Sequence, residues 1–134
     1  MRCSCCVRNR GAYPLPQGSG LRRNVSFVST ILFHELACGL ETADLKQKPR
    51  LTIFVAALRE RFGKSAIPVD LEIAETAGRL RAFEKANGRI LTVADSLMAA
   101  TAVVRDLTLA TRNVKDFETL GLKLINPFSD YGCP

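Results

Sequence analysis

The carboxylates of Asp95 and Asp116 are the side chains of this chain whose placement suggests chemistry. Asp95 lies in the first turn of a helix predicted to begin after Thr92, and Asp116 follows a short apolar strand predicted at residues 107–111. If that strand packs beside the start of the helix, the two carboxylates converge at one end of a sheet. Carboxylate oxygens are the ligands that hard cations such as Mg²⁺ or Mn²⁺ prefer. The spacing therefore favours a metal site at the carboxyl end of a sheet.

Each of these acids also has a structural interpretation, which the sequence leaves open. Thr92 and Asp95 have the Thr-x-x-Asp spacing of a capping-box variant, in which the acid stabilises the helix start and interacts favourably with the helix dipole. Asp116 is also suited to be the N-cap of a short turn at residues 117–119. For Asp95 the two roles are compatible, because a helix N-terminus orients the side chain toward the end of the sheet.

The elements that must position these residues alternate between helix and strand. An apolar stripe predicts a helix over residues 51–62 that begins near Pro49, and Asp70 is placed to cap the next helix, which Gly88 closes with a left-handed turn. The alternation predicts an α/β fold, a three-layer sandwich with one mainly parallel sheet between helices. Its strands are expected near four ranges: residues 25–28, 66–69, 107–111 and 122–125.

Two segments of the chain resemble a known family. The run LTVADSLMAATAVVRDLTLATRNVKDFETLGLKLINPF, residues 91–128, resembles the C-terminal third of a VapC-like PIN domain, and its most specific part is TRNVKDF. An earlier run, VSFVSTILFHELACGL at residues 25–40, resembles the second strand of that family and the helix that bears its Glu, here Glu35. Without the resemblance, Glu35 is equally well interpreted as a solvated surface residue, because it lies off the apolar stripe of its helix.

The resemblance implies a Mg²⁺-dependent ribonuclease toxin of a bacterial toxin–antitoxin pair. Glu35, Asp95 and Asp116 are then the catalytic and metal-binding carboxylates, and the Mg²⁺ or Mn²⁺ they hold activates a water that hydrolyses RNA phosphodiesters. Polar groups that would orient waters or a phosphate oxygen follow the strand: Thr111, Arg112 and Asn113. The implied partners are an RNA substrate, an antitoxin protein and a second copy of the chain in a homodimer.

One part of the family pattern is missing from the sequence. PIN domains usually begin with an apolar strand that runs into Asp-Thr-Asn and presents the first catalytic Asp at the centre of the sheet. Residues 1–24 contain no Asp, no Glu and no run of four apolar residues. We therefore expect a PIN domain that lacks its first strand and first carboxylate, with impaired metal binding and cleavage. The alternative is a non-catalytic remnant that only dimerises or binds an antitoxin.

The composition of the chain changes at about residue 24. Five of the 19 Lys and Arg residues, but none of the 13 acidic residues, lie before this point, so the rest of the chain is close to neutral. We predict an irregular basic segment at residues 1–24 and a partial PIN-like domain at residues 25–134, with the first segment outside the sheet. No apolar stretch is long enough for a membrane span or a signal peptide, so we expect a cytoplasmic protein without membrane partners.

Overall fold

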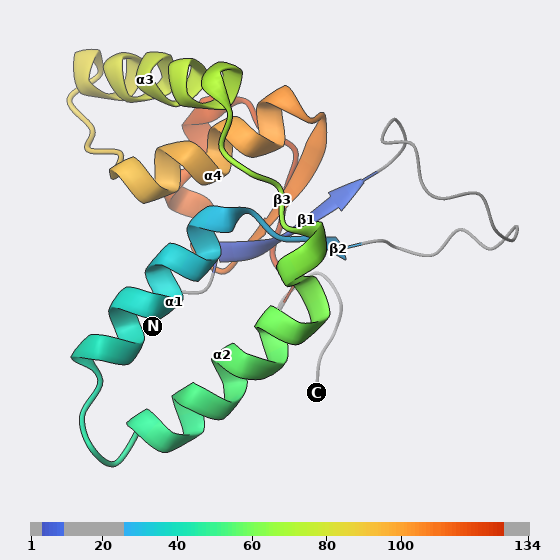
Figure 1. Cartoon of the computed structure of the whole chain (residues 1–134). Coiled ribbons are helices and arrows are strands. Elements are labelled where there is room, and N and C mark those ends of the chain that lie inside the picture. The colour runs from blue at the N-terminus through green and yellow to red at the C-terminus, as the bar shows by residue number, and fades with distance from the viewer. Residues whose placement is uncertain (1–3, 10–25, 128–134) are drawn as a thin grey trace, which may run out of the picture.

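The structure of the chain is a computed structural model that describes residues 4–9 and 26–127. Figure 1 shows helices α3 and α4 together on one side of the strands, and helices α1 and α2 as a hairpin that extends from the other side. The predicted α/β fold is confirmed. In chain order the elements are β1 (Ser4–Asn9), β2 (Ser26–Phe27), α1 (Thr30–Thr42), α2 (Lys48–Phe62), η1 (Gly63–Ser65), α3 (Leu71–Ala86), α4 (Val93–Val104), β3 (Leu107–Thr111), η2 (Val114–Asp116), η3 (Glu118–Leu120) and β4 (Leu124–Ile125), where η marks a 3₁₀ helix.

The four strands form one sheet in the order β2-β1-β3-β4. β1 runs antiparallel to both of its neighbours, β2 and β3, whereas β3 and β4 are parallel. Because β1 is reversed relative to both neighbours, β2, β3 and β4 all run in the same direction. A single parallel bridge between Ser29 and Ile67 adds a further short contact beside the sheet. The expectation of a mainly parallel sheet is therefore met by the direction of β2, β3 and β4 but not by the pairing of β1.

The expectation that residues 1–24 lie outside the sheet is wrong for Ser4–Asn9. These residues form a central strand, in which Val7 is in register with Phe27 on one side and Leu109 on the other. Strand pairing uses backbone N–H and C=O groups, and every residue carries both except proline, which lacks the N–H. A segment without a long apolar run can therefore still form hydrogen bonds with two neighbouring strands. Residues 1–3 and 10–25 lie outside the described residues.

Local signals explain where the helices begin and end. α1 is capped by Ser29, whose hydroxyl accepts a hydrogen bond from the backbone N–H of Ile31, and α2 has Pro49 in its first turn. Asp70 caps α3 through the N–H of Ile73, and Gly88 takes the left-handed conformation, with φ of 72°. The predictions for Pro49, Asp70 and Gly88 are confirmed, whereas the cap at Ser29 is a feature that the sequence analysis did not single out.

The strand predicted at residues 66–69 is reduced to the bridge at Ile67. The backbone N–H of Ile67 donates to Val28, and the carbonyl of Ile67 accepts from Thr30. Pro68 has no N–H to offer a strand on the opposite side, so this segment is confined to the edge of the sheet.

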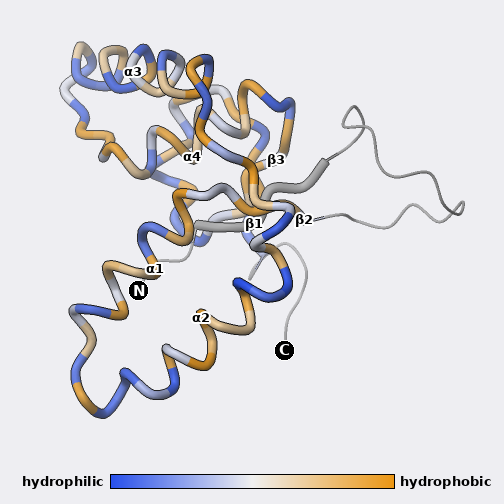
Figure 2. The backbone as a smooth tube through the Cα atoms, viewed as in Figure 1, coloured by the Kyte–Doolittle hydropathy of each residue, from blue (hydrophilic) through white to orange (hydrophobic). Residues whose placement is uncertain are grey.

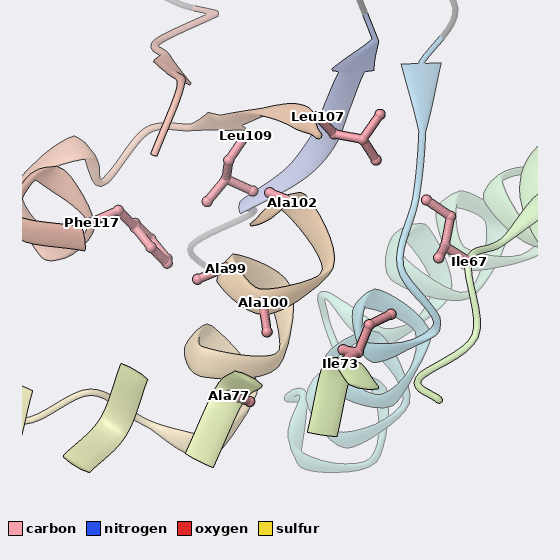
Figure 3. Close-up of a cluster of buried hydrophobic side chains, with 9 residues drawn as sticks. All are labelled: Ile67, Ile73, Ala77, Ala99, Ala100, Ala102, Leu107, Leu109 and Phe117. Carbon is pink, nitrogen blue, oxygen red and sulfur yellow. The ribbon is translucent and has the colours of Figure 1, made fainter. Parts of the chain in front are cut away.

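The main hydrophobic core lies between α3, α4 and β3, and α4 is its central element because it contacts α3, β3, β1 and α1. Phe117, Leu109 and Ile73 are fully buried there, together with small residues of α4. A second cluster, made by Val28, Leu32 and Leu36, packs against α2. Figure 3 shows the main cluster: Ile67, Ile73, Ala77, Ala99, Ala100, Ala102, Leu107, Leu109 and Phe117. Within the described parts of the chain, no helix has both the length and the hydrophobicity needed to cross a membrane.

Candidate functional site

The topology brings the segments that carry the three candidate carboxylates to one edge of the sheet. A two-residue turn at Arg105–Asp106 reverses the chain between α4 and β3, so the first turn of α4, with Asp95, lies toward the end of β3. Asp116 follows the end of β3 in η2. β2 runs in the same direction as β3, so α1, which carries Glu35, also begins at this edge (Figure 1).

Asp95 is half-buried in the first turn of α4 and is held by the residue that caps the helix. The Thr92 hydroxyl donates to the Asp95 carboxylate at 2.7 Å and accepts from the Asp95 backbone N–H at 3.1 Å. The structural role that the sequence left open for Asp95 is thus present. One carboxylate oxygen is not engaged by Thr92 and remains available to a ligand in geometric terms.

Asp116 is exposed at the end of η2, and its carboxylate accepts a hydrogen bond from the side-chain amide of Asn113. Asn113 is itself held by Thr111, a fully buried residue whose hydroxyl accepts from the Asn113 backbone N–H at 3.0 Å. The polar run after β3 therefore fixes its own turn. The N-cap of the following turn is Phe117, so the alternative in which Asp116 caps that turn is wrong. Arg112, the remaining residue of the run, is exposed.

Glu35 lies in the second turn of α1, on the exposed side of the helix. Leu32 and Leu36 form the buried face, and half of the Glu35 side chain, 51%, is exposed. Its carboxylate is 3.0 Å from the Nδ1 atom of the neighbouring His34.

The three carboxylates share an edge of the sheet but do not form one group. Among the described residues, no set of three or more His, Cys, Asp or Glu side chains lies close enough together to hold a metal ion. The expectation that Glu35, Asp95 and Asp116 lie within reach of a shared metal ion stays a prediction. Each carboxylate is engaged by a residue close to it in sequence. Mg²⁺ takes several oxygen ligands at close range, so Glu35, Asp95 and Asp116 are the residues at this edge that would have to supply them.

Glu84, which our sequence analysis did not single out, is the most buried acid near these segments, with 3% of its surface exposed. Its carboxylate accepts two hydrogen bonds from Arg89, at 2.6 and 2.9 Å, and one from the Thr119 hydroxyl at 3.0 Å. The Arg89 guanidinium, helped by Thr119, holds the pKa of Glu84 below its ordinary value. Glu84 therefore links two segments: the connection between α3 and α4, through Arg89, and the segment that follows Asp116, through Thr119.

A signal for Glu84 exists in the sequence. It stands near the end of α3, where an acid opposes the helix dipole and needs a compensating partner. The left-handed turn at Gly88 reverses the chain and returns Arg89 to that helix end. An acid in the last turn followed by a glycine and an arginine therefore predicts this pair.

A second ion pair ties α3 to the opposite end of α4. Arg105, directly after α4, donates to the carboxylate of Asp70, the N-cap of α3. The N–H of Ile73 and the charge of Arg105 lower the pKa of Asp70. With Glu84 at one end and Asp70 at the other, the two helices are held along their length.

Comparisons with known proteins agree with this architecture. A family model described as "PIN domain" matches residues 19–121. The chain is 34% identical over 106 residues to "VapC ribonuclease Y4jK" of Sinorhizobium fredii, covering 76% of this chain and 74% of that protein. It is 29% identical over 110 residues to "Plasmid stability protein StbB" of Pseudomonas syringae pv. tomato, covering 76% and 75%.

Two solved structures are similar as well. The structure of FitAcB from Neisseria gonorrhoeae matches with a TM-score of 0.65 and 28% identity, over 77% of this chain and 76% of that one. The structure of VapBC2 from Rickettsia felis bound to a promoter DNA fragment matches with a TM-score of 0.62 and 27% identity, over 73% and 71%. The chain belongs to the PIN-domain family, and the predicted resemblance to its VapC-like toxins is confirmed.

Proposed function

We propose that this chain is the toxin of a toxin–antitoxin pair, a ribonuclease that cleaves RNA with Mg²⁺ or Mn²⁺ and whose activity is impaired in the chain as given. The role as a toxin nuclease rests on membership of the PIN family and on relatives that are named as a VapC ribonuclease and as the toxin FitB. Glu35, Asp95 and Asp116 are the proposed catalytic and metal-binding residues, because their segments meet at one edge of the sheet.

One observation that supports the impairment is the lack of any group of three metal-ligating side chains among the described residues. A divalent cation bound by few carboxylates keeps most of its waters and is held weakly. The first Asp of the family pattern, which would add a ligand at the centre of the sheet, has no counterpart in the sequence before Ser26. Thr111, Arg112 and Asn113 keep a proposed role in orienting RNA at this edge.

An RNA-cleavage assay on the full chain tests this proposal. We expect no faster cleavage of RNA with Mg²⁺ or Mn²⁺ than with a chelator. Adding an apolar strand that ends in Asp-Thr-Asn ahead of Ser26 should restore metal-dependent cleavage. Asp95→Asn in that restored protein should remove the activity again, by on the order of a thousandfold, which corresponds to about 4 kcal/mol of transition-state stabilisation.

Two other outcomes would change the proposal. Metal-dependent cleavage by the unmodified chain that disappears on Asp95→Asn would overturn the impairment. A restored protein that folds but still fails to cleave RNA would favour the second candidate function, a non-catalytic remnant that binds an antitoxin or a second copy of the chain.

The exposed side of α2 favours this second candidate. No residue of α2 is fully buried, although Val55, Leu58 and Phe62 pack against α1. Ile53 and Phe54 leave 71% and 48% of their surfaces exposed, an arrangement typical of a face that a partner covers. Figure 2 shows hydrophobic residues recurring along this helix.

Binding of the antitoxin should therefore depend on α2. Ile53→Ala combined with Phe54→Ala is expected to weaken binding of the protein encoded beside this gene by more than tenfold in calorimetry, because hot-spot residues at an interface each contribute about 1–2 kcal/mol or more. Leu71→Ala, which removes an equally exposed aliphatic side chain from α3, is the control and should change binding less than twofold. Equal losses from both variants would argue against α2 as the docking face.

A further inference from the structure

A cavity on the outer side of α3 combines aliphatic and cationic side chains, and it is separate from the three carboxylates. It has a volume of about 430 Å³ and lies between α3 and the connection to α4. Three of the residues around it are cationic. The full lining is Gly78, Arg81, Ala82, Lys85, Arg89, Ile90 and Leu91.

The floor of the cavity is formed where α3 carries only small residues. Gly78 and Ala82 are one turn apart on the helix, and the hydrophobic connection opposite them supplies Ile90 and Leu91 (Figure 2). Ile90 leaves 97% of its surface exposed, the largest exposure of any large hydrophobic residue in the described chain. The hollow therefore offers aliphatic contact to a group from outside.

Gly78 is not required by the fold. A Cβ added at this position meets no atom within 4 Å, and the residue lies in the middle of an α-helix. Glycine destabilises a helix interior relative to alanine, and no neighbouring atom requires a glycine at this position. Because Gly78 has no side chain, the cavity stays open at this position.

The rim of the cavity carries positive charge that the protein itself neutralises only in part. Arg89 is fixed by its two hydrogen bonds to the buried carboxylate of Glu84, which makes that wall rigid. Arg81 donates through Nε to the carbonyl of Leu91 at 3.3 Å, which ties the helix to the connection. Within residues 26–127, no acidic side chain forms an ion pair with Arg81 or Lys85.

We propose that this cavity binds a peptide segment of the antitoxin in which an aliphatic side chain is followed by acidic residues. The aliphatic side chain fills the hollow over Gly78, and the carboxylates pair with Arg81 and Lys85. A peptide fits better than RNA for two reasons. The lining contains no aromatic ring on which a base would stack, and the chain after residue 24 is close to neutral instead of forming an extended basic surface.

The identity of the partner rests on the proposed function, but the binding chemistry can be tested without it. The probe is a blocked synthetic peptide, Ser-Glu-Leu-Leu-Asp-Glu-Ser, titrated into the ¹⁵N-labelled full chain and followed by NMR. The expected result is a set of amide shifts confined to the residues that line the cavity. A peptide with Lys in place of its acids should produce none of these shifts.

Variants of one residue separate filling of the hollow from damage to the fold. Gly78→Leu should fill the cavity and weaken peptide binding at least tenfold, whereas Gly78→Ala should bind within twofold of the parent. Both should keep or raise helix stability, because glycine is unfavourable in a helix interior and a Cβ here meets no atom within 4 Å. Lys85→Glu should weaken binding severalfold. Arg79→Glu reverses a charge on the same helix outside the lining and is the control.

Several outcomes would overturn the proposal. They are the absence of shifts at millimolar peptide, unchanged peptide binding by Gly78→Leu, or tighter binding of a uridine octanucleotide at the same residues, which would assign the site to nucleic acid. None of these results depends on RNA cleavage or on α2, so failure of this proposal is distinguishable from failure of the proposed function.

Discussion

At the scale of single residues, the acids of this chain differ in how they are satisfied. Asp95, Asp116 and Glu35 are each held by a neighbour in sequence and keep part of their surface open to solvent. Glu84 is buried and is held by residues from two other segments. The first kind of acid is available to a ligand, whereas the second organises the structure around the site.

Glu84→Gln should lower the stability of the protein at neutral pH, because the amide cannot accept both hydrogen bonds from Arg89 and carries no charge to pair with it. The pKa of Glu84 is lowered in the folded state, so its contribution is present above the ordinary value of 4.5 and is lost as the pH falls through the folded-state pKa. Urea unfolding should therefore separate the parent from the variant at pH 7 and show the two midpoints converging toward pH 3. Glu75→Gln, which alters an exposed pair with Arg79, is the control and should have little effect at any pH. A constant difference across the pH range would contradict the assignment.

At the scale of elements, the start of α4 combines a structural device with a candidate site. The Thr92 hydroxyl both caps the helix and donates to the carboxylate of Asp95. The same side chain therefore stabilises α4 and fixes one oxygen of the candidate ligand.

Thr92→Ala should destabilise the protein by about 1 kcal/mol, the usual cost of losing an N-cap hydroxyl. Thr92→Ser keeps the hydroxyl and should recover most of that loss. Equilibrium unfolding in urea measures both values. Equal stability of the Ala and Ser variants would show that the hydroxyl, and with it the cap, does not contribute.

The helices were predictable because their signals are local. Asp70, Thr92 and Gly88 act on backbone groups within a few residues of themselves, and the structure places each of them as the sequence indicates. The strand expected at residues 66–69 is reduced to one bridge at Ile67, directly before Pro68, a residue type confined to sheet edges and strand ends. The segments that carry the three candidate carboxylates were also predictable, whereas the position of the carboxylates relative to one another depends on how distant elements pack.

At the scale of the whole molecule, β1 is the feature that no local signal predicts. Ser4–Asn9 occupies the position between β2 and β3, where both neighbours would otherwise leave backbone groups unpaired. Unpaired strand edges favour aggregation, so a sheet without a strand at this place would be fragile. The antiparallel insertion of β1 provides a strand at this place, with the opposite direction from β2, β3 and β4.

A proline within β1 tests whether this strand stabilises the sheet. Val7 has a pairing partner on each side, so its N–H lies within a paired stretch of backbone, and Val7→Pro removes that donor. We expect a loss of about 1–3 kcal/mol in urea unfolding, the cost of leaving a buried backbone partner unsatisfied, together with increased aggregation. Val7→Thr, which keeps the backbone N–H and a β-branched side chain, is the matched control and should unfold at nearly the parent urea concentration. If Val7→Pro were as stable and soluble as that control, the sheet would not depend on β1.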